Sequence, residues 1–125
     1  MITQYKNIFL NLKKGFDYAD FLEFAQGIKG RYNLYLIANE DIDTPVPFDK
    51  KFIGAEMGLK LPSLAIFDKA LEQAGCLPAE CIFVDNDITN IHSAEEVGMA
   101  PILLYNGNGY YDTTIYSFSE LLNFI

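Results

Sequence analysis

The segment 81–90, Cys-Ile-Phe-Val-Asp-Asn-Asp-Ile-Thr-Asn, constrains the fold of this chain more than any other stretch. Its first four residues form an uninterrupted apolar run, which is typical of a strand buried on both faces of a parallel sheet. The polarity changes at Asp85, Asn86 and Asp87, and a helical pattern of apolar residues follows and stops at Gly98. Because ligands of open α/β sheets bind outside the carboxyl ends of strands, this cluster is a candidate site. The competing interpretation is that Asp87 or Asn86 only caps the following helix.

Apolar runs and helical patterns alternate along the rest of the chain. The runs predict strands at 5–12, 33–38, 52–55 (at a sheet edge) and 101–105, besides the one at 81–84. Helical patterns predict a helix over about 18–29 capped by Asp17, one from Pro62 to Gly75, and a short last helix with a Ser117–Glu120 capping box. The segment 39–50, with Pro45 and Pro47, predicts irregular structure. The order predicts an α/β fold: a three-layer, Rossmann-like parallel sheet of about five strands with helices on both faces.

Length and charge narrow the function classes. The 125 residues predict a single domain over 1–125, and half of them are hydrophobic, as in a globular protein. A net charge of −8 without a basic patch argues against nucleic acid and anionic membranes as partners. No apolar run is long enough to span a membrane, and no signal peptide is evident. The two cysteines, Cys76 and Cys81, match no metal spacing, which favours reduced thiols and a cytoplasmic location.

Three segments together resemble the haloacid-dehalogenase-like hydrolases. Residues 6–15, Lys-Asn-Ile-Phe-Leu-Asn-Leu-Lys-Lys-Gly, are similar to the first strand and nucleophile loop of that family. Residues 58–62, Gly-Leu-Lys-Leu-Pro, with the helical pattern after them, resemble the Lys-Pro helix start. Residues 83–99, which begin Phe-Val-Asp-Asn-Asp, are similar to the metal-binding loop and its helix, and they are the most specific of the three.

The resemblance implies phosphoryl transfer, and the sequence departs from it at most catalytic positions. The family uses an aspartate nucleophile, an acid/base aspartate two residues later, a hydroxyl after the second strand, a phosphate-holding lysine, and acidic residues that bind Mg²⁺ with the nucleophile. At those positions this chain carries, in order, Asn11, Lys13, Ala38, Leu61, and Asp85 followed by Asn86. Asn39, beside Ala38, still fits the family pattern, and Asp87 is an extra carboxylate. The short segment between Lys13 and the first helix also leaves no room for a cap domain.

These departures predict a site in which a lysine of the chain neutralises the remaining aspartate. Asn11, Lys13 and Asp85 should converge where the first and fourth strands lie side by side, and Lys13 would then occupy the cation position and pair with Asp85. No cofactor or metal is expected under this hypothesis; if one binds, Asp85 and Asp87 would hold Mg²⁺. The alternative is that Lys13 points to solvent.

The leading hypothesis is therefore a capless domain, inactive in phosphoryl transfer, that acts as a binding, regulatory or oligomerising protein, with a homodimer or protein partner possible. The alternative is a residual Mg-dependent hydrolase of a small phosphorylated substrate. His92, the only histidine, is expected to be a surface or packed residue. Four tyrosines near the C-terminal end could line a ligand cleft or a partner surface, or could cover the sheet edge: Tyr105, Tyr110, Tyr111 and Tyr116.

Overall fold

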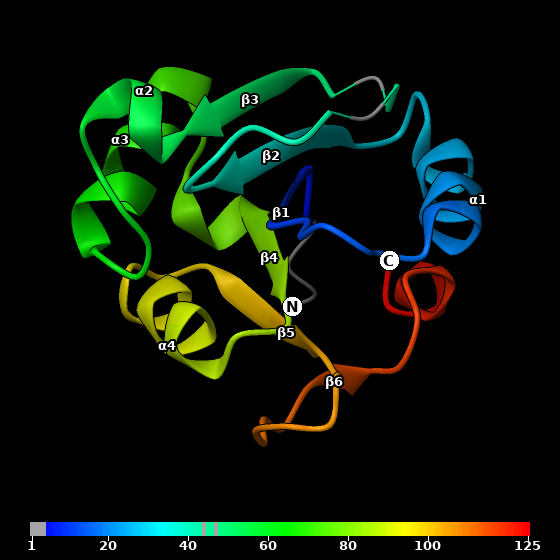
Figure 1. Cartoon of the computed structure of the whole chain (residues 1–125). Helices are drawn as coiled ribbons and strands as arrows, with labels where there is room; N and C mark the ends of the chain where they lie inside the picture. Colours follow the sequence, from blue (N-terminus) through cyan, green and yellow to red (C-terminus); the bar gives the residue numbers. More distant parts are fainter. Residues whose placement is uncertain (1–4, 44, 47) are drawn as a thin grey trace.

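A computed structural model describes residues 5–43, 45–46 and 48–125 (Figure 1). Its strands are β1 (Asn7–Leu10), β2 (Asn33–Ala38), β3 (Lys50–Ile53), β4 (Cys81–Asp85), β5 (Ala100–Leu104) and β6 (Thr114–Ile115). They form one parallel sheet in the order β3-β2-β1-β4-β5-β6. The predicted parallel α/β fold is confirmed, with six strands rather than about five.

The sixth strand was missed because it carries almost no sequence signal. Thr114 and Ile115 are too few to show a pattern, and β6 forms because the N–H groups of Leu103 and Tyr105 donate to carbonyls of the 113–115 segment. The predicted edge strand is β3, two residues earlier than expected. The predicted first strand, 5–12, is shorter in the structure, where β1 begins at Asn7 and ends at Leu10.

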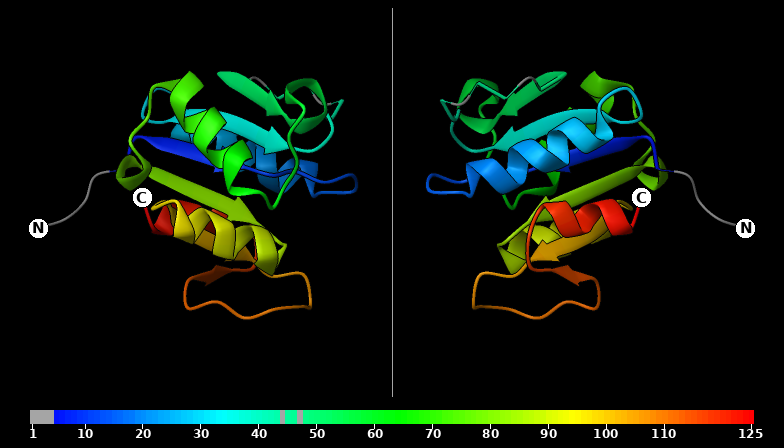
Figure 2. Two further views of the ribbon diagram at one scale, coloured as in Figure 1. Left: turned by 90° about the vertical axis from the view of Figure 1, so that its left-hand side faces the viewer. Right: turned by 90° about the vertical axis from the view of Figure 1, so that its right-hand side faces the viewer.

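Helices cover both faces of the sheet (Figure 2). One face carries α1 (Tyr18–Ile28) and the 3₁₀ turn η2 (Ser119–Asn123), and the other carries α3 (Leu64–Ala74) and α4 (Ile88–Glu96). Each helix buries its apolar stripe; Phe21, Phe24 and Ile28 of α1 lie against the sheet. A one-turn helix, α2 (Gly54–Met57), follows β3, and a 3₁₀ turn, η1 (Pro78–Glu80), precedes β4. No helix within the described ranges has the length and apolar character needed to cross a membrane.

The helix ends agree with the sequence in part. Asp17 caps α1 as predicted, since its carboxylate accepts from the Asp20 N–H at 3.0 Å. The prediction that a helix begins at Pro62 is wrong: Pro62 lies in a turn closed by the Ser63 N–H and the Lys60 carbonyl, and α3 begins at Leu64. Of the irregular 39–50 segment, Pro47 and Thr44 lie outside the described residues, and Lys50 already belongs to β3.

The C-terminal turn is held by a side chain from the start of α1. The Asp20 carboxylate accepts from the backbone N–H groups of Phe118 and Ser119, the second at 3.0 Å. The predicted capping box is present with one shift, because Ser117 Oγ accepts from the Glu120 N–H while Glu120 accepts from Tyr116. These contacts place residues 116–118 beside the carboxyl ends of the central strands.

Candidate functional site

The candidate site lies where β1 and β4 end. The two strands are parallel neighbours, with Leu10 opposite Val84, so that Asn11 follows β1 beside Asp85, the last residue of β4. The Asn11 N–H continues the ladder to the Val84 carbonyl at 3.1 Å. The loop from residue 11 to 17 then joins β1 to α1 with one turn and with no helix or strand in between. Nothing inserted in that loop therefore covers the strand ends.

Asp85 is the centre of a dense hydrogen-bond network. It is 1 % exposed. Its Oδ2 accepts from Asn11 Nδ2 at 3.0 Å and from Asn90 Nδ2 at 2.7 Å. Its Oδ1 accepts from the backbone N–H of Asn86 at 2.6 Å, from that of Asp87 at 3.1 Å, and from the ammonium of Lys13. Five donors thus meet a carboxylate that offers about four lone-pair directions.

Lys13 supplies the positive charge of this network. Its ammonium forms an ion pair with Asp85 and also donates to Asn86 Oδ1 at 2.7 Å. The Lys13 side chain is 43 % exposed while that of Asp85 is 0 % exposed, so the pair is open to water on the lysine side only. The predicted convergence of Asn11, Lys13 and Asp85 is confirmed, and the alternative in which Lys13 points to solvent is wrong.

Asp87, the extra carboxylate, acts as a helix cap. Its Oδ1 accepts from the Thr89 N–H at 2.9 Å and from the Thr89 hydroxyl at 2.6 Å, and α4 begins at the next residue. These bonds to Thr89, aided by the charge of Lys13, hold the pKa of Asp87 below its usual range. The capping interpretation is therefore correct for Asp87, whereas Asn86 serves as an acceptor for Lys13.

The remaining positions of the family pattern have structural contacts. Ala38 is 3 % exposed and Leu61 is 5 % exposed, and both are packed in the core. Asn39 Oδ1 accepts from the Leu61 N–H at 2.7 Å, which ties the loop after β2 to the turn before α3. No ammonium or hydroxyl is therefore supplied from positions 38 and 61 to the strand ends.

The donor set does not fit a divalent cation. Within the described residues, no three His, Cys, Asp or Glu side chains gather closely enough to hold a metal ion. Asp85 already directs its oxygens at five donors, and one of these is an ammonium. Mg²⁺ needs oxygen ligands with free lone pairs in a near-octahedral arrangement. The residues present at this site would have to lose the Lys13 pair before they could offer such ligands.

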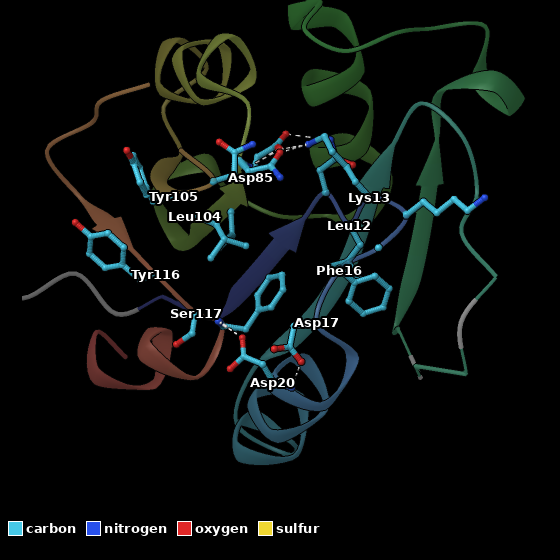
Figure 3. Close-up of a pocket in the computed structure, with 17 residues that line it drawn as sticks. Leu12, Lys13, Phe16, Asp17, Asp20, Asp85, Leu104, Tyr105, Tyr116 and Ser117 are labelled. Atoms are coloured by element: carbon cyan, nitrogen blue, oxygen red, sulfur yellow. Dashed lines mark hydrogen bonds and ion pairs between the residues drawn. The ribbon is translucent and has the colours of Figure 1, made fainter. Parts of the chain in front are cut away.

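A crevice of about 260 Å³ opens beside the ion pair (Figure 3). Figure 3 shows Asp85 and Lys13 at one end, Asp17, Asp20 and Ser117 at the other, and Tyr105 and Tyr116 along one side. Its other apolar lining residues are Leu12, Phe16, Val84, Leu104 and Phe118. The prediction that tyrosines line a cleft applies to Tyr105 and Tyr116, whereas sequence reasoning missed Ser117 and Phe118. The Asp20 contacts, together with the packing of Phe118 on Phe21, bring these two residues to the crevice.

The other residues singled out in the sequence lie elsewhere. Tyr110 is 79 % exposed, and Tyr111 donates to Glu95 and packs edge-on against His92. Only Tyr105 and Tyr116, of the four tyrosines, line the crevice. His92 is exposed on α4 and is no part of the site, as expected.

The architecture of this chain is similar to that of solved haloacid-dehalogenase-family structures. No family model matches the chain. A 2-haloacid dehalogenase from Pseudomonas syringae pv. Tomato has a similar structure, with a TM-score of 0.76 at 19 % identity over 85 % of this chain and 51 % of the dehalogenase. A haloacid-dehalogenase-family enzyme from Bacteroides thetaiotaomicron, solved with magnesium and inorganic phosphate, has a TM-score of 0.70 at 16 % identity over 85 % of this chain and 97 % of that one. The chain has the haloacid-dehalogenase-like fold.

Sequence comparison points the same way. The D-ribitol-5-phosphate phosphatase of Bacteroides thetaiotaomicron is 25 % identical over 107 residues, which take in 69 % of this chain and 50 % of the phosphatase. The chain thus matches half the length of this curated relative. Together these likenesses establish the haloacid-dehalogenase-like fold and leave the activity to be argued from the site.

Proposed function

We propose that this haloacid-dehalogenase-like domain does not transfer phosphoryl groups and acts as a binding, regulatory or oligomerising protein. The observation that carries the proposal is the Lys13–Asp85 ion pair, with Asn11 donating to the same carboxylate. Lys13 stands at the acid/base position of the family pattern, and its ammonium occupies the side of Asp85 that a cation would otherwise approach.

Nucleophilic attack on phosphorus needs an ionised carboxylate or another activated nucleophile. Asn11, at the nucleophile position, carries an amide that already donates to Asp85 at 3.0 Å. Removing the nucleophile of a catalytic unit alone removes most of the rate. Asp85 cannot replace it, because it is 1 % exposed and its lone pairs are engaged.

A residual Mg-dependent hydrolase is the second candidate, and the similarity to a D-ribitol-5-phosphate phosphatase favours it. Under that hypothesis Asp85 or Asp87 would hold Mg²⁺ and a small phosphorylated substrate would bind over it. This would require Lys13 to leave Asp85 and would cost α4 its cap at Asp87.

Hydrolysis of p-nitrophenyl phosphate and acetyl phosphate in the presence of Mg²⁺ separates the two candidates. We expect no turnover above that of buffer, for the native chain and for Asp85→Asn alike. Mg-dependent turnover that Asp85→Asn removes, in a variant whose circular dichroism is unchanged, would overturn the proposal. Light scattering on the same samples measures whether the chain forms a homodimer.

A gain-of-binding variant tests the charge argument directly. The double change Asn11→Asp with Lys13→Ala replaces an amide and an ammonium by one carboxylate beside Asp85. Two adjacent carboxylates repel each other and attract a divalent cation. Calorimetry should show Mg²⁺ binding by the double variant and none by the native chain. Equal binding by both would contradict the proposal.

A further inference from the structure

The crevice beside the ion pair has an aromatic side that no other part of the described chain covers. Tyr105 is 44 % exposed and Tyr116 is 69 % exposed. Their ring centroids lie 5.6 Å apart in an edge-to-face arrangement, and both rings border the crevice (Figure 3). Leu12 and Phe16 contribute apolar surface to the same space. Aromatic and apolar groups gathered at a concave surface are typical of a site for a flat, apolar molecule.

The carboxylates of the crevice are already engaged. Asp20 accepts from the N–H groups of Phe118 and Ser119, and Asp17 accepts from the Asp20 N–H. Asp85 accepts from five donors. A cationic ligand would therefore compete with protein donors for the oxygens of Asp85 and Asp20, while Asp17, which uses one oxygen as the cap of α1, lies at the end of the crevice away from Lys13 (Figure 3).

Lys13, in contrast, keeps an unused donor. An ammonium has three N–H groups. Two of them are directed at Asp85 and Asn86, and the Lys13 side chain remains 43 % exposed along the crevice. The third N–H suits a carbonyl oxygen or another neutral acceptor.

Charge and size limit the ligand further. Three carboxylates and two ammonium groups line the crevice, so its net charge is −1 on a chain of −8. The net negative charge of the lining disfavours a doubly charged phosphate, because Asp85 neutralises Lys13 and the ammonium of Lys14 is outnumbered by the carboxylates of Asp17 and Asp20. The volume of about 260 Å³ lies below the range of about 300–1,000 Å³ usual for drug-sized ligands. It suits a single ring with one substituent.

The geometry points to this crevice as a binding site for a small, neutral, single-ring aromatic molecule that carries a carbonyl acceptor. The ring lies against Tyr105 and Tyr116, and the acceptor receives the free N–H of Lys13. This inference rests on the proposed binding function and names the ligand class for it.

Three probes of one shape and different charge test the inference: benzamide (neutral), benzamidine (cation) and phenyl phosphate (anion). Each is titrated into the ¹⁵N-labelled chain, and backbone amide shifts are followed by NMR. We expect benzamide to shift signals of the crevice residues with a dissociation constant of about 1–10 mM, and to bind several-fold tighter than the two charged probes.

Variants assign the contacts. Tyr116→Ala should weaken benzamide binding by about threefold to tenfold, as expected for the loss of one aromatic contact. Tyr110→Ala is the matched control, because Tyr110 is 79 % exposed and lies outside the crevice lining, and it should bind as the native chain does. Lys13→Met should weaken the binding of benzamide more than that of toluene, which has no acceptor.

The inference is overturned if benzamide causes no shifts at about 10 mM, shifts signals elsewhere, or binds more weakly than either charged probe. It is also overturned if Tyr116→Ala and Tyr110→Ala bind benzamide equally well. The phosphatase assay is independent of these results. If the chain shows neither phosphatase activity nor benzamide binding, only this inference is contradicted. Mg-dependent turnover contradicts the proposed function.

Discussion

Replacing Asp85 should destabilise the chain far more than replacing Lys13, although the two form one ion pair. Asp85→Ala removes the acceptor of five donors. Asn90, at 5 % exposure, is the donor that water cannot readily reach, and an unsatisfied buried donor costs about 1–3 kcal/mol. Loss of the charged hydrogen bonds adds about 1.5–3 kcal/mol. We therefore expect Asp85→Ala to lower the free energy of unfolding by about 2.5–6 kcal/mol.

Lys13→Ala should cost only about 1 kcal/mol. The Lys13 side chain is 43 % exposed, and exposed ion pairs contribute about 0–1 kcal/mol. Asp85 would keep four N–H donors, from Asn11, Asn90 and two backbone groups, so its negative charge would still be stabilised by hydrogen bonds.

Urea unfolding followed by circular dichroism measures both changes, with the midpoint and slope extrapolated to water. Asp68→Ala, at an exposed position on α3, is the control and should stay within about 0.5 kcal/mol of the native chain. The reasoning is refuted if Asp85→Ala costs less than Lys13→Ala, or if it stabilises the chain. Stabilisation is the result expected of a strained catalytic carboxylate rather than of a satisfied structural one.

Three further predictions concern Asp87, two glycines and a thiol. The pKa of Asp87 is lowered by its bonds to Thr89, so the stabilisation from its carboxylate is complete above the unfolded pKa of about 3.9 and is lost as the pH falls through the folded pKa. Asp87→Ala should therefore lower the free energy of unfolding by about 1 kcal/mol at pH 7, and by progressively less in unfolding measured toward pH 3. Gly54→Ala makes the new Cβ clash with the backbone carbonyl oxygen of Leu59 and should lower the stability by about 1–3 kcal/mol. Gly27→Ala meets only the flexible side chain of Leu122 at 3.0 Å and should cost less in thermal unfolding. Burial raises the pKa of the Cys81 thiol to about 12, so iodoacetamide at pH 8 should leave Cys81 unmodified in the folded chain and alkylate it in concentrated urea, as read by mass spectrometry; rapid alkylation without urea would contradict this.

The regular elements of the fold could be predicted because their signals are local. Strand β2 is the segment 33–38 that the apolar run indicates, and the cap of α1 at Asp17 follows from residue type alone. The start of α3 was predicted two residues too early, since the turn at Pro62 depends on the contact of Leu61 with Asn39 across the fold. Strand β6 depends entirely on β5 and leaves no local pattern.

The sequence predicts which residues converge at the site, but it does not predict the hydrogen-bonding role of each one. The positions of Asn11, Lys13 and Asp85 follow from parallel pairing of β1 with β4, and the charges of the residue types predict that Lys13 pairs with Asp85. The sequence leaves open whether Asn86 or Asp87 caps the following helix. In the structure Asp87 caps α4, and Asn86 accepts a hydrogen bond from Lys13. Backbone direction at the end of β4 decides which side chain turns toward the site.

A parallel α/β fold with a polar cluster after the 81–84 run follows from the sequence, because the polarity of each side chain can be read residue by residue. The role of that cluster follows only from contacts made in the folded chain. Five donors from the loop after β1, the turn after β4 and α4 meet at Asp85. Asp20 holds Phe118 and Ser119, from the other end of the chain, beside the crevice. Such contacts join residues far apart in sequence, and hydrogen-bond satisfaction at a buried carboxylate is a property of the assembled neighbours rather than of any one segment.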